Sequence, residues 1–510
     1  MCFLLKYSTL CDKIDRAAPS LSPCCDGVKI RQNPAAVRIR IRIFMSISKN
    51  KFIGDRAFYK KVLAISVPMM IQNGVANLAS LLDNVMVGSV GTEAMSGVSI
   101  VNQFVFIFYL SVFGAISAAG IFTAQYHGLG DEEGVRNTFR FKLIINLAAG
   151  AVAVALFFFF SDALISSFLH DSASEGDLEL TLAYGREYLM IMLWGMIPYS
   201  LAQAYASTMR ETGDAKIPMI AATGGVLVNL VLNTVLIFGL FGLPAMDVKG
   251  AAIATVISRF AELLILVIYA HTHRDSYKFL KGAFRSFKVP ASLATRIIVK
   301  GLPIMLNEIL WASAITSRSG CYATRGLDVV AGLNIASTVC NLFNVVYMAL
   351  GSSIAIVIGN LLGAGEIERA KDEARKMMAF SVTCSVGISV LLACISPLFP
   401  LIYNTTSEVR RVATYVILIN AAITPFMAFA HSAYFTIRSG GKVLVTLLFD
   451  SVFVWCVTFP IAFALSSFTQ MNIYLLYPLC QSAEIIKMAF GLILLKKTDW
   501  ARQVVGNGDL

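Results

Sequence analysis

Twelve apolar stretches, each long enough to cross a lipid bilayer as a helix, decide what this chain can fold into. A helix needs about 20 apolar residues to span a hydrocarbon core about 30 Å thick. Only 14% of the 510 residues are charged, whereas a soluble domain carries about 25%. The sequence therefore predicts an all-α polytopic membrane protein with 12 transmembrane helices. The expected spans lie at about residues 62–86, 98–126, 141–160, 188–208, 216–240, 250–271, 298–321, 328–359, 377–396, 412–437, 443–466 and 471–495.

Lysine and arginine are concentrated in every second connection between these stretches. Such connections face the cytoplasm, so both termini are predicted to be cytoplasmic. The net charge of +11 is therefore a topology signal, and no nucleic-acid partner is expected. These basic loops, without a cleavable signal, predict a multi-pass protein of a bacterial plasma (inner) membrane. Four arginines depart from the pattern, namely Arg318, Arg325, Arg410 and Arg411.

The two halves of the chain are copies of each other at a constant offset of 235 residues. Pro68 meets Pro303, and the glycines of one half meet glycines of the other. Because each copy has six spans, both enter the membrane from the same side, as a parallel repeat about an axis along the membrane normal. The sequence therefore predicts two six-helix lobes with a substrate cavity between them. The paired glycines are Gly91 and Gly326, Gly97 and Gly332, Gly128 and Gly363, and Gly130 and Gly365.

The repeat also sets the expected domain boundaries. Residues 45–285 form the first lobe, 286–497 the second, and 498–510 a cytoplasmic tail. Residues 1–44 contain no apolar run long enough to span a membrane. We interpret them as a dispensable or disordered extension before a true start at Met45, the alternative being a targeting extension that starts at Met1.

Two segments carry a family resemblance. SVPMMIQNGVANLASLLDNVMVGSVG in the first span and GLPIMLNEILWA in the seventh, with two Arg-Gly turns, resemble the multidrug and toxic compound extrusion (MATE) family over about residues 55–497. The resemblance implies secondary active efflux, in which Na⁺ or H⁺ enters as amphipathic, drug-like organic cations leave by alternating access. It implies no cofactor beyond the coupling ion, and we expect a monomer in the bilayer.

Glu308 is the strongest candidate for the coupling or substrate-binding group. It lies about ten residues into the seventh stretch, or roughly 15 Å deep at 1.5 Å per residue. A carboxylate at that depth is expensive and is by default a functional residue, the alternative being a buried hydrogen-bonding role. GLPIMLNE also resembles the segment in which many members of the family carry a functional acidic residue.

Asp83 is a second candidate, in the motif NLASLLDN of the first span. An Asp at this motif position serves ion or proton coupling in some relatives, whereas here it could instead reach outer water or pair with Arg318. Those relatives add an Asp in the fifth span where this chain has Asn233. Because an amide cannot take up a proton at neutral pH, a proton relay confined to the first lobe is disfavoured.

Asp450 is the third candidate, about eight residues into the eleventh stretch. It either completes an acidic pair with Glu308 or hydrogen-bonds neighbouring helices. The residues expected to line the cavity beside these carboxylates are Gln72, Asn73, Asn233, Asn307 and Trp311.

Two further pairs of buried charges are expected to be structural. Arg259 and Glu262, like Glu484 and Lys487, are three residues apart and can pair on one helical face. His431 is the histidine deep in a span, and we expect it to be satisfied by a hydrogen bond.

Three other functions compete with efflux. A flippase for lipid-linked precursors or polysaccharides would need a strongly cationic cavity, and the first and seventh spans offer mainly Arg318. An enzyme would need convergent catalytic groups or metal ligands, and the sequence shows no HExxH motif and no Cys/His cluster. A channel suits the duplicated, proline-containing halves less well than alternating access does. The sequence leaves the substrate and the choice of Na⁺ or H⁺ open.

Overall fold

The structure, a computed structural model, describes residues 51–166 and 175–505. The predicted extension 1–44 lies outside the described residues. Within them the chain is all helical, and twelve helical segments are long and apolar enough to span a membrane. The predicted number of spans is therefore confirmed.

The first lobe contains six uninterrupted helices. They are α3 (Arg56–Gly88), α4 (Thr92–Leu129), α5 (Glu132–Ser166), α6 (Glu175–Glu211), α7 (Lys216–Phe238) and α8 (Asp247–Thr272). All of these helices except α7 begin earlier than the apolar stretches alone predict, because charged residues form part of their first turns. Asp55 starts α3 by accepting a hydrogen bond from the Phe58 amide at 2.8 Å.

The second lobe repeats this order but breaks its last two spans. Its first four helices are α9 (Ala291–Ala323), α10 (Leu327–Gly363), α11 (Ile367–Ile395) and α12 (Ser407–Ser439). The eleventh span consists of α13 (Val443–Leu447), two π-helical segments at Leu448–Val452 and Val454–Thr458, and α14 (Phe459–Phe468). The twelfth consists of α15 (Ile473–Gln481) and α16 (Ala483–Lys497).

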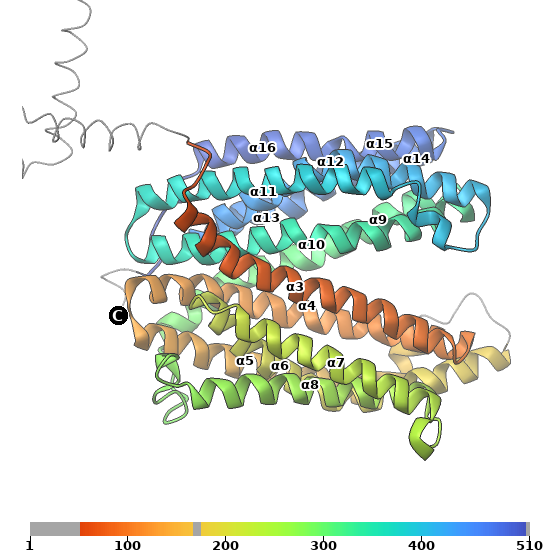
Figure 1. The fold of residues 1–510 in the computed structure, drawn as a ribbon, viewed down its shortest axis with the longest axis horizontal. Coiled ribbons are helices and arrows are strands. Elements are labelled where there is room, and N and C mark those ends of the chain that lie inside the picture. The colour runs from red at the N-terminus through yellow and green to blue at the C-terminus, as the bar shows by residue number, and fades with distance from the viewer. Residues whose placement is uncertain (1–50, 167–174, 506–510) are drawn as a thin grey trace, which may run out of the picture. The chain divides into compact units, whose positions relative to one another are not determined.

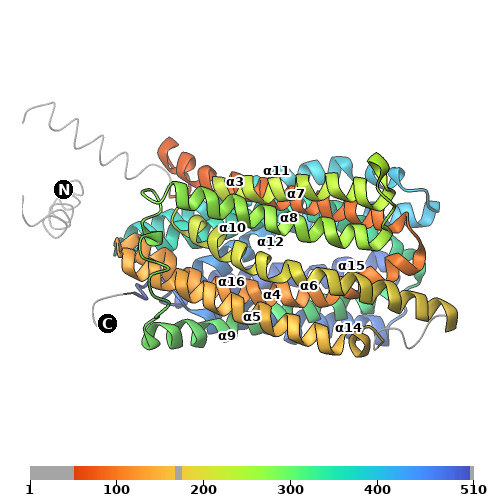
Figure 2. The same ribbon diagram turned by 90° about the horizontal axis from the view of Figure 1, so that it is seen from below.

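The two lobes meet through the first two helices of each. In Figure 1, α4–α8 gather in one group and α10–α16 in another, while α3 runs obliquely between the groups; Figure 2, seen from below, shows α5–α8 in front. α3 packs on α7 of its own lobe and on α10 of the other, and α9 correspondingly packs on α4. The predicted two-lobe architecture is confirmed, and its interface is built from α3, α4, α9 and α10.

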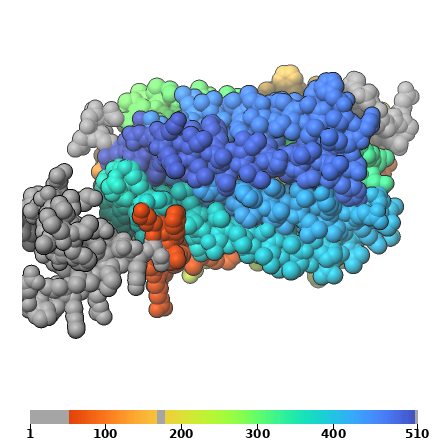
Figure 3. Space-filling model, turned by 90° about the horizontal axis from the view of Figure 1, so that it is seen from above, coloured from red at the N-terminus to blue at the C-terminus, as the bar shows by residue number. Residues whose placement is uncertain are grey.

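The outside of the second lobe is apolar. Figure 3 shows this side, where the helices of the C-terminal half lie closely side by side. Large apolar side chains are exposed on these helices, including Val390, Leu391, Ile486 and Ile493. In a bilayer the exposed parts of such side chains contact lipid.

The lobes approach each other most closely at one face, which carries the α4–α5, α6–α7, α8–α9, α10–α11 and α12–α13 connections and is called the basic face below. The repeated turn glycines Gly130 and Gly365 end α4 and α10 there with φ of +79° and +77°, a conformation that favours glycine. Just before them, Gly128 lies against the backbone of Asn360, and Gly363 against that of Gln125, so closely that a Cβ on either glycine would overlap the neighbour. Turn glycines of the repeat therefore also close the interface.

Residues 498–505 lie across this closed face. The side chain of Gln125 in α4 accepts a hydrogen bond from the Val504 amide at 2.5 Å and donates one to the Ser439 carbonyl of α12 at 3.0 Å. Gln503 donates to the Gly363 carbonyl at 2.7 Å, and Val505 is only 2% exposed. The segment thus contacts both lobes at once, and we call it the C-terminal strap.

Candidate substrate and coupling site

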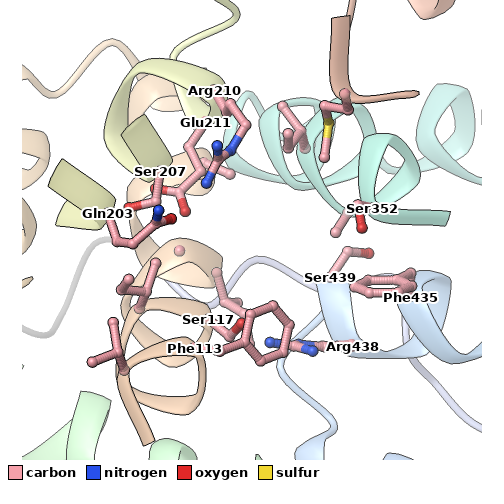
Figure 4. A pocket seen from close by; sticks show the side chains of 18 of the residues that line it. Phe113, Ser117, Gln203, Ser207, Arg210, Glu211, Ser352, Phe435, Arg438 and Ser439 are labelled. Carbon is pink, nitrogen blue, oxygen red and sulfur yellow. The ribbon is translucent and has the colours of Figure 1, made fainter. Parts of the chain in front are cut away.

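Two adjoining cavities lie at and beside the interface of the lobes. The central cavity, about 300 Å³, is lined by both lobes and is shown in Figure 4. The second, about 360 Å³, lies mainly in the second lobe between α9, α10, α12, the π-helical segment and α16. They share four lining residues, Asn73, Phe113, Ser352 and Phe435. One ligand of ordinary drug size can therefore contact both cavities.

Glu308 lines the second-lobe cavity near the middle of α9. No Lys or Arg nitrogen in the described part of the chain lies within 4 Å of its carboxylate, so it has no ion-pair partner there. Arg438 and Asp450 act on it only through the electric field. Glu308 is thus a partly buried carboxylate without a bonded counter-charge, in the wall of a cavity.

Asp450 lies in the same cavity but is already paired. Its Oδ1 lies 2.6 Å from the Lys487 ammonium, and its Oδ2 accepts a hydrogen bond from Asn307 at 3.1 Å. The expected pairing of Lys487 with Glu484 is wrong, because the neighbouring helix brings Asp450 within bonding distance of the ammonium. Glu484 makes no ion pair within 4 Å among the described residues and lies in the electric field of both Lys487 and Arg318.

The π-helical segment holds α9 in place beside the cavity. Ser451 donates to the Asn307 carbonyl at 2.6 Å, and the Trp455 indole donates to the Leu310 carbonyl at 2.9 Å. Both carbonyls are within two residues of Glu308. A π-helical turn is uncommon and often marks a functional position, and here it fixes the backbone on either side of the candidate carboxylate.

Asp83 lies apart from both cavities, in the first lobe. Its Oδ1 accepts a hydrogen bond from Asn233 at 2.6 Å, and the chain of amides continues through Asn229 to Thr255. The alternative pairing of Asp83 with Arg318 is wrong, because α7 packs on α3 and supplies Asn233 as the partner. The predicted pair of Arg259 and Glu262 is present at 3.4 Å.

The remaining expected lining residues divide between the cavities. Gln72 and Asn73 line the central cavity, Asn73 and Trp311 line the second-lobe cavity, and Asn307 is buried behind it, bonded to Asp450. Asn233 lines neither of these two cavities and stays with Asp83. His431 belongs to the wall of the second-lobe cavity, where its ring contacts Tyr347 and Phe435.

Sequence reasoning missed Arg210 and Arg438, which both line the central cavity. They are in the two Arg-Gly turns, which the sequence presents simply as repeated connections. The signal that could have found them is the repeat itself, since a charge kept in both copies at the ends of spans points toward the shared interface.

The described residues contain no group of three or more His, Cys, Asp or Glu side chains that could hold a metal ion. The polar groups of the two cavities are carboxylates, amides, hydroxyls, guanidinium groups, the Lys487 ammonium and the His431 imidazole.

The twelve-helix, two-lobe fold around a shared cavity defines the class of protein, a membrane transporter. The family model MatE matches twice, at residues 68–235 and 303–470, and these two matches are the two halves of the repeat. The chain therefore belongs to the MatE family of multidrug and toxic compound extrusion transporters, which are not enzymes. The predicted family is confirmed.

Individual relatives agree in sequence and in fold. The chain is 24% identical over 416 residues to "Probable multidrug resistance protein NorM" of Thermotoga maritima, covering 81% of this chain and 87% of that protein. It is 24% identical over 410 residues to "Probable multidrug resistance protein YoeA" of Bacillus subtilis, covering 80% and 87%.

Solved structures share the fold at low sequence identity. One is described as the outward-facing conformation of a multidrug resistance MATE family transporter of the MOP superfamily, with a TM-score of 0.78, 20% identity, and coverage of 87% of this chain and 98% of that one. Another, MATE in the bent conformation, gives a TM-score of 0.76 at 19% identity and covers 86% and 96%. The likeness supports the two-lobe fold.

Proposed function

We propose that the chain is a secondary active efflux transporter that exchanges amphipathic organic cations for Na⁺ or H⁺. The observation that carries the proposal is Glu308, a carboxylate without an ion-pair partner among the described residues, in the wall of a cavity that adjoins the lobe interface. Such a group can hold a metal cation, a proton or an organic ammonium, and it can hold only one of them well.

Coupling follows from that exclusivity. Two unit positive charges about 4 Å apart repel by about 4 kcal/mol at an effective dielectric constant of 20. An entering ion or proton therefore displaces an organic cation from Glu308, and the cation reloads after the ion has left. The exchange becomes vectorial when the two lobes open the cavity alternately to the two sides.

The closed basic face indicates the side of the membrane to which the cavity opens in this conformation. Loops rich in Lys and Arg remain in the cytoplasm, so we assign the basic face, with both termini, to the cytoplasmic side of the plasma membrane. A transporter closed at that face is in its outward-facing state, from which cargo leaves and the coupling ion enters. We further propose that it works as a monomer, because one chain contains both lobes and the whole cavity.

The charges of the second-lobe cavity favour organic cations over a lipid-linked pyrophosphate. It contains three carboxylates, Glu308, Asp450 and Glu484, against two permanent cations, Arg318 and Lys487. This balance disfavours a flippase that would have to hold a pyrophosphate in this lobe.

The test is transport in proteoliposomes with an imposed Na⁺ gradient in one arm and an imposed pH gradient in the other. Glu308→Gln should abolish the gradient-driven movement of a fluorescent organic cation, because the amide keeps the shape but loses the charge. Glu368→Gln is the matched control, since Glu368 is exposed on the basic face and pairs with Lys371. Undiminished transport by Glu308→Gln in both arms would overturn the proposal.

A further inference from the structure

The central cavity contains two arginines, one from each lobe. Arg210 is in the last turn of α6, and Arg438 is in the last turn of α12. The two helices are the fourth spans of their lobes, so the arginines occupy related positions in the repeat. Figure 4 shows Arg210 beside Glu211 and Gln203, and Arg438 between Phe113 and Phe435, on opposite sides of the cavity.

The carboxylate that lines this cavity does not neutralise them. Glu211 is bonded to the ammonium of Lys142, whose side chain is fully enclosed. Neither arginine has an Asp or Glu oxygen within 4 Å in the ranges 51–166 and 175–505. With Glu211 and Lys142 cancelling, the central cavity has an excess of two positive charges.

Arg438 is not exposed to solvent as an ordinary surface charge would be. It is only 3% exposed, it donates to the Tyr434 hydroxyl at 3.3 Å, and its guanidinium lies 5.4–6.0 Å from the ring centres of Phe113, Tyr434 and Phe435. Rings stabilise a cation but leave its N–H donors unused. A buried charge is costly without a bonded counter-charge, and the open side of this one is the cavity.

We propose that the central cavity binds an anionic group of the transported molecule, a carboxylate or similar oxyanion, between Arg438 and Arg210. The cargo is then a zwitterion, whose cationic end reaches Glu308 in the adjoining cavity. Guanidinium groups suit such oxyanions because they can donate two parallel hydrogen bonds. Ser117, Ser352 and Gln203 supply further donors around the same space.

The inference rests on the proposed function where it places the cationic end of the cargo at Glu308. The evidence for the anionic end comes from the central cavity alone. Phe113 and Phe435 line both cavities, so aromatic side chains are available to a ligand that reaches from one charged end to the other. A planar amphipathic molecule with an amine at one end and a carboxylate at the other therefore matches the order of groups along the two cavities.

The test uses two dyes that differ by one charge, namely rhodamine B with its free carboxylate and the ethyl ester of the same dye. Fluorescence polarisation gives the affinity of each dye for the full-length protein in lipid nanodiscs. Arg438→Gln should lower the preference for the carboxylate dye over the ester by about tenfold, the scale of one charge-assisted hydrogen bond. Arg210→Gln should lower it in the same direction, and Arg438→Lys should restore part of it.

Arg375→Gln is the control, because Arg375 is exposed at the basic face and pairs with Asp372, and it should leave the preference unchanged. An unchanged preference in both Arg438→Gln and Arg210→Gln, or an equal fall in Arg375→Gln, would overturn the inference. If Arg438→Gln does not fold, the preferences of Arg210→Gln and Arg438→Lys for the carboxylate dye over the ester still test the inference. Glu308→Gln tests the proposed function separately, since it should weaken both dyes, which share the cationic ring system.

Discussion

Lys487 is an enclosed lysine whose partner comes from another helix. Its side chain is 10% exposed, that of Asp450 is 19% exposed, and the ion pair between them is 2.6 Å long. Removal of one member of an enclosed pair leaves the other charge without compensation, and this is more damaging than removal of both. Each member of the pair therefore compensates the charge of the other, and Glu308 remains the carboxylate available for exchange.

Lys487→Met is expected to destabilise the protein by about 3 kcal/mol, because Asp450 then keeps its charge without a counter-charge. Adding Asp450→Asn to that variant should recover most of the loss. Thermal unfolding in detergent, followed by tryptophan fluorescence, measures the stability of the single and of the double variant. A double variant no more stable than Lys487→Met would contradict the role of the pair.

Asp83 gives the corresponding prediction for the first lobe. Asp83 accepts a hydrogen bond from the amide of Asn233, and an amide in place of the carboxylate can still accept that hydrogen bond. Asp83→Asn is therefore expected to keep more than half of the ion-driven transport that Glu308→Gln loses. Initial rates in proteoliposomes, normalised to the amount of inserted protein, decide the point. Complete loss of coupling in Asp83→Asn would move the coupling site to the first lobe.

At the scale of elements, the sequence predicts the helices well because apolar length is a local property. Each expected span overlaps one helical segment, and the spans expected at 216–240, 377–396 and 471–495 extend one or two residues beyond it. The π-helical segment at 448–458 could not be predicted, since it differs from an α-helix only in hydrogen-bond register and leaves hydropathy unchanged.

The same limit applies to the site. Glu308 and Asp450 could be selected from sequence because charges are rare in spans, and the structure places them in one cavity. Their partners depend on which helices pack together, so Lys487 was expected beside Glu484, three residues away, and lies beside Asp450 instead. Arg210 and Arg438 were missed because residues at helix ends normally face water.

The C-terminal strap gives a prediction at the same scale. A chain that ends after Thr498 loses the contacts of Gln503, Val504 and Val505 with both lobes. Deletion should therefore shift the protein toward states open at the basic face. Spin labels at Glu133 in α5 and Glu368 in α11, both exposed at that face, should report longer distances between the lobes.

A chain that ends after Val505 is the control for the strap, since it keeps every contact named above. It should give the same distance distribution as the full chain, in a background without reactive cysteines. Equal distributions for the two truncations would mean that the strap does not hold the face closed.

For the whole molecule, closure of the basic face depends on two backbone contacts without side chains between them. Gly128 lies against Asn360 and Gly363 against Gln125, each too close for a Cβ. The backbone of a rigid helix cannot yield as a flexible side chain can. Gly128 and Gly363 are therefore repeat counterparts in opposite lobes, and both allow the backbones of the two lobes to come into contact when the basic face closes.

Gly128→Ala combined with Gly363→Ala is expected to prevent full closure and to reduce transport at least tenfold, while the folded protein still inserts. Gly387→Ala is the matched control, because nothing lies within 4 Å of a Cβ there. Transport rates and the spin-label distances measure the two effects. Normal transport by the double variant would show that the face closes in another way.

The strap also matters for anyone who handles this protein. Val505 is enclosed between the two lobes. An affinity tag or fluorescent protein fused directly after Val505 would pull on the segment that bridges the moving halves. Fusions with a long flexible spacer are therefore the safer choice, because a direct fusion could itself change the balance of conformations that an assay sets out to measure.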